Sequence, residues 1–182
     1  MKYIWIWAIE FGLVNIPVKM YSATESSTLD LDMLDKKDLS NIKFKRVNEK
    51  TGKEVDWVNI VKGYKVDDNY VVLDDEDFEA ASPEKSKVFS IQQFVNENEI
   101  ESVFFETPYF LEPQKNGENA YVLLREALKK TQKVGVGTFV MRNKEILGVV
   151  KPYHDLLIIN TIRFPEELRE YNELNVSDKK VK

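Results

Sequence analysis

The chain has 182 residues, of which 43% are hydrophobic and 12% aromatic, and its formal net charge is −5. This composition supports a packed core, and the absence of cysteine excludes disulfide scaffolds, cysteine-based zinc sites and cysteine nucleophiles. No apolar run approaches the roughly 20 residues of a membrane-spanning helix, and the N-terminus lacks the features of a signal peptide, so we expect a soluble protein of the cytoplasm.

Strand signals dominate the N-terminal half. The run from Ile4 to Ile9 is apolar at every position, which predicts a strand covered on both faces. Gly12 predicts a bulge or a close backbone approach. Segment 41–47 alternates Ile42 and Phe44 with lysines, which predicts a strand with one basic face. Further strands are expected at 69–73, 88–91, 103–105, 136–141, 146–150 and 156–162.

Three helices are expected. The acidic cluster 74–77 predicts a short helix through Ala81 with Asp74 as its N-cap, and we prefer this interpretation to a metal site. The main helix is indicated by one apolar stripe, with a cap at Asn116 or Asn119 and a stop at Gly135. A short helix begins at Pro165. The stripe consists of Ala120, Leu123, Leu124, Ala127 and Leu128.

Many short strands with one good helix predict a mainly β, α+β fold, in which a closed or nearly closed β-barrel carries packed helices. No shift in composition marks a domain boundary, so we expect one body over residues 1–170 and a frayed tail over 171–182.

The sequence offers little material for catalysis. There is one histidine, His154, in a predicted loop, and no Gly-rich phosphate loop or nucleophile elbow is present. Carboxylates are plentiful, but none is marked out by its surroundings. We therefore expect a protein that is not an enzyme and that needs no cofactor and no metal.

Charge is distributed unevenly along the chain. Residues 36–65 hold nine basic and four acidic groups, residues 66–112 hold two and 13, and residues 113–163 hold nine and four. A fold could gather the two basic blocks on one face, because an acidic face more than about 8 Å away is screened at physiological salt. Ordinary solvated surface charge explains the pattern equally well.

Basic groups at exposed positions suit phosphate contacts that do not depend on base sequence. The candidate contacts are Lys43, Lys45, Arg46, Lys62, Arg142 and Lys144, with Lys36, Lys37 and Lys151 behind them. Most aromatic residues, including Trp5 and Trp7, lie in apolar runs and are assigned to the core. Two other functions stay open: a β-barrel that binds proteins through a sheet edge or the acidic stretch 67–79, and a single-stranded nucleic-acid binder that stacks bases on aromatic side chains.

Several segments, in order, resemble the bacterial Ku proteins, which bind DNA ends in non-homologous end joining. The resemblance begins in residues 4–24 and covers nearly the whole chain, although Asp32, Asp35, Asn41 and Asn48 depart from the family's usual residues. The later segments are Lys36-Lys37-Asp38, Lys45-Arg46-Val47, Gly52-Lys53-Glu54-Val55, Ile60-Val61-Lys62-Gly63-Tyr64, Tyr70-Val71-Val72-Leu73, Pro108-Tyr109-Phe110-Leu111, the helix 120–128, Val140-Met141-Arg142-Asn143-Lys144-Glu145 and 157–165.

The resemblance implies a β-barrel core with a projecting strand bridge and one main packed helix. It also implies a homodimeric ring that threads onto a double-stranded DNA end without reading bases, and a dedicated ATP-dependent DNA ligase as partner. Such a protein would be associated with the nucleoid. Family members usually continue beyond this region into a helical segment and a basic tail, which are tied to dimer stability and ligase recruitment.

Overall fold

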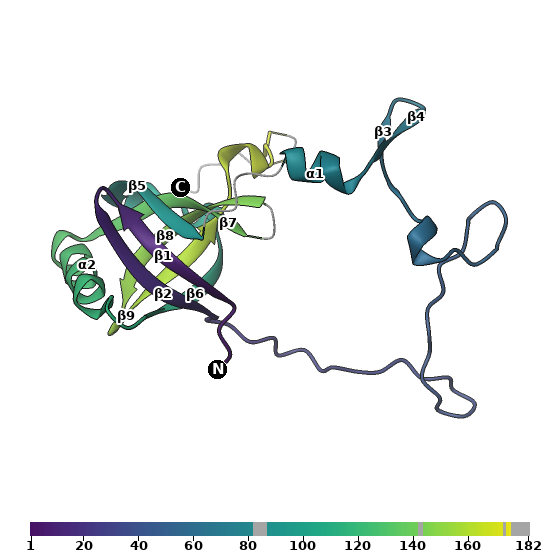
Figure 1. Ribbon diagram of the computed structural model, residues 1–182, viewed down its shortest axis with the longest axis horizontal. Helices are drawn as coiled ribbons and strands as arrows, with labels where there is room; N and C mark the ends of the chain where they lie inside the picture. Colours follow the sequence, from purple (N-terminus) through teal and green to yellow (C-terminus); the bar gives the residue numbers. More distant parts are fainter. Residues whose placement is uncertain (82–86, 142–143, 173, 176–182) are drawn as a thin grey trace, which may run out of the picture. The chain divides into compact units, whose positions relative to one another are not determined.

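The computed structural model describes residues 1–81, 87–141, 144–172 and 174–175. Within these ranges seven strands form a closed barrel in the order β1-β2-β6-β9-β8-β7-β5 (Figure 1). The predicted mainly β fold, with a closed barrel and one main helix, is confirmed. The barrel strands are β1 (Trp5–Phe11), β2 (Val14–Ser22), β5 (Val88–Asn96), β6 (Phe105–Pro113), β7 (Lys133–Met141), β8 (Lys144–Tyr153) and β9 (Leu156–Ile162).

The barrel closes through a short parallel seam between β1 and β5. Ala8 to Glu10 pair with Val88 to Ser90, whereas the other barrel strands pair antiparallel. β5 continues past this seam and pairs with β7 as far as Asn96. Parallel neighbours need a long connection between them, and the chain supplies one in residues 26–82.

The core fills the barrel, and its side chains alternate along β1 and β2, whereas β8 and β9 bury consecutive residues. In β1, Trp7 and Ile9 are buried, and the Trp7 ring meets Phe139 edge-on at 4.3 Å between centroids. Ile6, which precedes Trp7 and faces the other side of the strand, is 44% exposed, so the prediction that this strand is covered on both faces is wrong. Gly12 is not a bulge: with a φ of +56° it forms the turn between β1 and β2.

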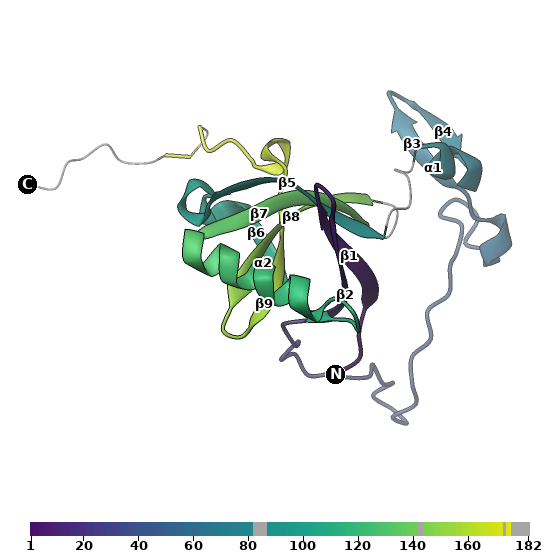
Figure 2. The ribbon, with the colours of Figure 1, turned by 60° about the vertical axis from the view of Figure 1, so that its left-hand side comes forward.

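The long helix α2 (Glu118–Thr131) packs against the barrel through one face (Figure 2). Tyr121, Leu124 and Leu128 are buried. The Tyr121 hydroxyl donates to the Leu111 carbonyl on β6 and accepts from the Leu157 N–H on β9, both at 2.6 Å.

Both predicted ends of this helix are wrong. It begins after Gly117 without a side-chain cap, and it ends at Gln132, which takes the left-handed conformation (φ 55°) that we expected of a glycine. Gly135 lies inside β7 instead.

Residues 26–82, here called the insert, form a compact unit of their own, and residues 1–25 and 83–182 form the other. The insert holds η1 (Trp57–Asn59), the hairpin β3 (Lys62–Val66) and β4 (Asn69–Leu73), and α1 (Asp75–Ala81). Asp74 caps α1 as predicted, since its carboxylate accepts from the Asp77 N–H at 2.9 Å. No described side chain of the insert is buried.

The predicted strand at 41–47 does not form. Only isolated bridges occur there, between Leu34 and Asn41 and between Val47 and Glu54. The alternating pattern was correct for an extended chain, but a strand also requires a neighbour along its length, and the described residues provide none.

Three further short helices belong to the barrel unit: η2 (Glu97–Glu99), η3 (Ser102–Phe104) and η4 (Pro165–Glu167). The last begins at Pro165 as expected. The strand predicted at 103–105 falls largely on η3, and β6 starts only at Phe105. No helix among the described residues is long and apolar enough to cross a membrane.

Candidate nucleic-acid interface

Two loops of the insert, each closed by an isolated bridge, present pairs of lysines. Lys36 and Lys37 lie in the loop between Leu34 and Asn41, where Asp35 and Ser40 fix the backbone through bonds of 2.8 Å. The same loop holds Asp38, whose pKa is lowered by hydrogen bonds from the backbone N–H and then the hydroxyl of Ser40. Both lysines are exposed, so the loop can present them to an anion.

The second loop runs from Val47 to Glu54 and carries Lys50 and Lys53, which were not among the predicted DNA contacts. Asn48 closes it by accepting from the Lys50 and Thr51 N–H groups, both at 3.0 Å. These two lysines lie on no alternating strand pattern. The sequence does indicate a turn at Thr51-Gly52-Lys53, and Gly52 takes a φ of +67° there, so this turn signal could have placed both lysines at a loop tip.

Between the loops the chain is extended and strongly basic. Lys43 is exposed. Lys45 forms an ion pair with Glu54 at 2.6 Å, and the Arg46 guanidinium lies 4.4 Å from the centre of the exposed Trp57 ring. The pair and the stacking tie this stretch to the second loop and to η1. They also leave Lys43 without an ion pair among the described residues.

Lys62 opens β3, and its ammonium group lies 4.5 Å from the centre of the Phe78 ring on α1. A cation over an aromatic face keeps its charge and remains a donor to phosphate on its open side. The contact packs the hairpin against the helix and sets the position of this predicted site residue within the insert.

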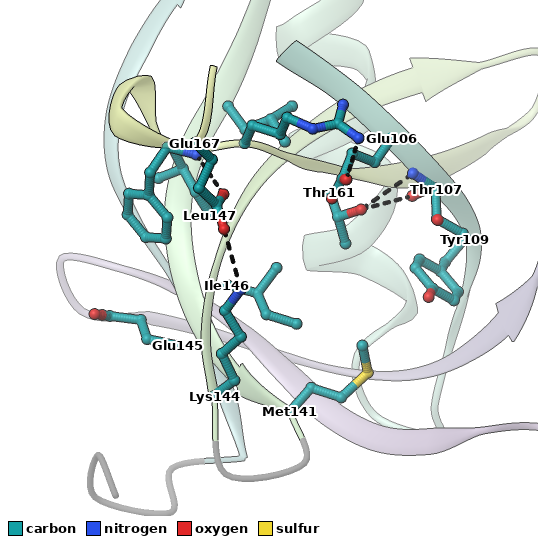
Figure 3. Close-up of a pocket in the computed structure, with 13 residues that line it drawn as sticks. Glu106, Thr107, Tyr109, Met141, Lys144, Glu145, Ile146, Leu147, Thr161 and Glu167 are labelled. Atoms are coloured by element: carbon teal, nitrogen blue, oxygen red, sulfur yellow. Dashed lines mark hydrogen bonds and ion pairs between the residues drawn. The ribbon is translucent and has the colours of Figure 1, made fainter. Parts of the chain in front are cut away.

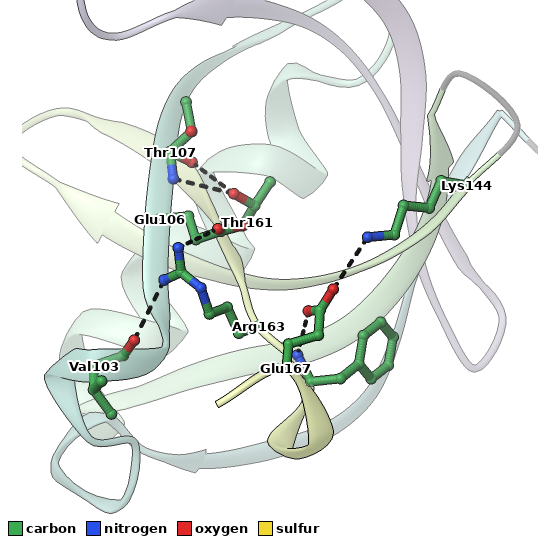
Figure 4. Close-up of polar contacts among 8 residues, drawn as sticks. Val103, Glu106, Thr107, Lys144, Thr161, Arg163 and Glu167 are labelled. Carbon is green, nitrogen blue, oxygen red and sulfur yellow. Dashed lines mark hydrogen bonds and ion pairs between the residues drawn. The ribbon is translucent and has the colours of Figure 1, made fainter. Parts of the chain in front are cut away.

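On the barrel, Lys144 lies at the start of β8 in a polar pocket of about 300 Å³ (Figure 3). It pairs with Glu167 of η4 at 3.1 Å. Arg163, in the same pocket, pairs with Glu106 at 2.7 Å and reaches the Val103 carbonyl (Figure 4). Each cation of the pocket thus has a carboxylate beside it, and an incoming phosphate would compete with Glu167 for Lys144.

The Glu167 carboxylate is fixed beside Lys144 by two hydrogen bonds. It accepts from the Phe164 N–H at 3.0 Å as well as from Lys144. These two bonds, the backbone one first, lower its pKa. The carboxylate is therefore ionised at neutral pH and neutralises Lys144 in the free protein.

Lys151 has a different environment from the other predicted contacts. It pairs with Glu97 and lies 5.2 Å from the centre of the Phe105 ring, and its side chain is only 22% exposed. These contacts hold the loop before β6 against β8, which is a structural role. Arg142 lies outside the described residues.

The structure thus describes the predicted site residues in two groups. Lys36, Lys37, Lys43, Lys45, Arg46 and Lys62 belong to the insert, and Lys144 and Lys151 belong to the barrel. Aromatic side chains accompany the first group: Trp57, Tyr64 and Tyr70 are all about two-thirds exposed, against our assignment of most aromatic residues to the core. Over the described ranges no group of three His, Asp or Glu side chains is placed to hold a metal ion.

Comparison with known proteins gives the family. The model of the Ku70/Ku80 beta-barrel domain matches residues 10–182. Curated relatives named "Non-homologous end joining protein Ku" include those of Coxiella burnetii (39% identical, over 98% of this chain and 66% of the relative), Cupriavidus necator (42%, over 96% and 52%) and Bacillus subtilis (38%, over 100% and 61%). The chain spans between about half and two-thirds of the length of these relatives. With its closed barrel, its one long helix and this match over almost its full length, the chain belongs to the Ku family.

Proposed function

We propose that this protein binds the ends of double-stranded DNA without regard to base sequence and acts in non-homologous end joining. The observation that carries the proposal is the insert: residues 36–65 hold nine basic and four acidic groups on loops and extended chain, and none of their described side chains is buried. Lysines on such loops suit phosphate oxygens, which every sequence presents alike.

Neither α-helix among the described residues is suited to reading a groove. α1 begins with Asp75, Glu76 and Asp77, whose charge repels phosphate. α2 places its buried face on the barrel. We therefore expect the protein to contact the phosphates of the DNA backbone and not the edges of the bases. The protein in this proposal is a binding factor and not an enzyme.

We further propose that two copies form the binding ring and that the insert supplies the bridge. A two-stranded hairpin is at best marginally stable alone, yet the insert forms one although none of its described side chains is buried. It also exposes large apolar residues, which are costly to leave in water. A second copy of the chain would cover the exposed apolar residues of the insert, and a DNA duplex would cover its exposed basic residues. These apolar residues include Leu29, Leu31, Met33, Trp57, Val58, Val61 and Val72.

The remaining parts of the proposal follow from the family. A ring on a DNA end needs an enzyme to join two ends, and a dedicated ATP-dependent DNA ligase is the partner proposed here. The protein itself would need no nucleotide and no other cofactor. Its place of action would be the bacterial chromosome, in the cytoplasm.

A gel-shift series with matched linear duplex, closed circular duplex and single strand tests the binding mode. Threading predicts clear preference for the linear duplex, and equal binding to the circle would refute it. Tighter binding of the single strand would favour the alternative in which Trp57, Tyr64 and Tyr70 stack on bases. Absence of binding to all three at physiological salt would favour a protein-binding barrel.

A charge series tests the residues. Lys43→Ala should weaken binding to all sequences alike and reduce the slope of log affinity against log salt by about 0.9. Lys130→Ala, on α2 of the barrel unit, is the matched control and should leave the slope unchanged. Equal slopes for the two variants would remove Lys43 from the interface. Mass measurement with and without a short duplex reports whether two copies assemble.

A further inference from the structure

An apolar groove of about 540 Å³ runs between α2 and the ends of the β1, β2 and β5 strands. Its walls are Phe11 on β1, Val14 on β2, Phe94 on β5, and the α2 residues from Ala120 to Thr131. Figure 2 looks onto α2, whose axis runs across the barrel beside these strands. The groove lies wholly within the barrel unit and shares no lining residue with the predicted DNA contacts.

The groove exists because apolar side chains at the ends of β1 and β5, and on one side of α2, are left partly uncovered by the rest of the barrel unit. β1 and β5 pair only as far as Glu10 and Ser90, and beyond the seam Phe11 and Phe94 meet edge-to-face at 5.7 Å. The apolar stripe of α2 is also wider than its buried face, since Leu123 is 72% exposed. Of the predicted stripe, the barrel buries only Leu124 and Leu128 fully.

The lining favours a helix as occupant. It consists almost entirely of side-chain carbon, so an extended peptide would leave its backbone N–H and C=O groups without partners along the wall. A helix satisfies these groups internally. The α2 wall from Ala120 to Thr131 is about 17 Å long, which is about three turns, and the small side chains of Ala120 and Ala127, seven residues apart, admit a close neighbour.

Charge indicates which helix would fit. Lys133 lines one end of the groove, and Lys130 of the last turn of α2 is exposed. Lys129 is already paired with Glu126 at 3.7 Å. This end therefore presents two cations that have no ion pair among the described residues.

We propose that this groove binds an amphipathic helix of a partner protein, with acidic residues at the end beside Lys130 and Lys133. The partner's leucine-type side chains enter the gap between Phe94 and Leu123, in the manner of helices that lie in hydrophobic grooves. We expect binding here to be independent of DNA, because no residue proposed for DNA contact lines this groove.

A fluorescent panel of helical peptides, each of about four turns, tests the proposal on the full chain. One peptide carries leucines every three or four residues and glutamates in one end turn. The second has lysines in place of these glutamates, and the third has serines in place of the leucines. We expect the glutamate peptide to bind by fluorescence anisotropy, at least about tenfold more tightly than either other peptide, with or without a DNA duplex.

Leu123→Glu should weaken this binding at least about tenfold, because it puts a charge where a leucine-sized surface was being covered. Val122→Glu, on the adjacent exposed position that does not line the groove, is the matched control and should change binding less than about twofold. Circular dichroism shows whether both variants keep the wild-type fold, as their exposure predicts. Failure of every peptide to bind below about 1 mM, or equal losses for the two variants, would overturn the proposal.

Discussion

Replacing Tyr121 with phenylalanine removes a single hydroxyl group, and it should destabilise the barrel more than the removal of one atom from any other side chain of α2. The hydroxyl joins the Leu111 carbonyl and the Leu157 N–H, residues that face each other across β6 and β9. Removing it leaves a buried donor and a buried acceptor without their partner, and each costs about 1–3 kcal/mol. We therefore expect a loss of about 2–6 kcal/mol in the free energy of unfolding.

Chemical denaturation with urea measures this loss, and the melting temperature should fall by about 2–4 °C for each kcal/mol lost. Tyr153→Phe is the control, because Tyr153 is 46% exposed and its hydroxyl has no hydrogen bond among the described residues. A loss for Tyr121→Phe no larger than that for Tyr153→Phe would refute the reasoning.

The dependence of stability on pH gives a second measurement of the same interaction. Burial raises the pKa of Tyr121 above its ordinary value of 10.0. The wild-type protein should therefore lose this stabilisation as pH rises above 10 and through the raised pKa, whereas the phenylalanine variant should not.

Three other outcomes are expected. Gly137→Ala should prevent closure between β5 and β7 or cost about 3 kcal/mol or more of unfolding free energy, because its new Cβ would lie 1.9 Å from the Ser90 carbonyl oxygen; a urea midpoint within error of wild type would contradict this. Lys151→Ala should lower the melting temperature while the salt slope of DNA binding stays unchanged, since Lys151 is engaged by Glu97 and Phe105; a reduced slope would return it to the DNA interface. Glu167→Gln should strengthen binding to linear duplex about twofold, because it frees Lys144 from its ion pair. The difference from wild type should vanish as pH falls below the ordinary carboxyl pKa of 4.5 and through the lowered pKa of Glu167, where the wild-type side chain is also neutral. A difference that persists at that pH would exclude competition by the Glu167 carboxylate.

The barrel was predictable because most of its strands are marked by short runs of apolar residues in the sequence. Runs such as 156–162 are apolar over a strand's length, and in the structure this segment is β9 with most of its side chains buried. Asp74 could be identified as a cap from its immediate neighbours. In both cases the sequence pattern that predicts the element lies within a few residues, although β9 itself is completed by pairing with the more distant β6.

The insert was not predictable in the same way. Its apolar and charged residues are mixed along the chain, and we expected no boundary at residues 26 and 82. The alternation at 41–47 predicted a strand, but pairing depends on a distant neighbour that a sequence pattern does not reveal. The apolar stripe of α2 identified the helix correctly while overstating what the barrel would cover, since Leu123 is left in the groove.

The predicted site residues show the same limit. Exposed basic positions were recognisable, and Lys151 was ranked behind Lys43, but nothing in the sequence indicated that Glu97 and Phe105 would hold Lys151. Nor was there any sign in the sequence that Glu167 would meet Lys144, because those residues are brought together only by the turn at η4.

The way the insert joins the barrel has a mechanical consequence. It leaves after β2 and returns before β5, and these two strands are the neighbours of β1 on either side. Tension between the ends of the insert would therefore load the edges that flank the three-pair parallel seam, where few hydrogen bonds share the strain. Pulled in an optical trap by handles within the insert, the barrel should rupture first at β1, at a lower force than when pulled through β7 and β9.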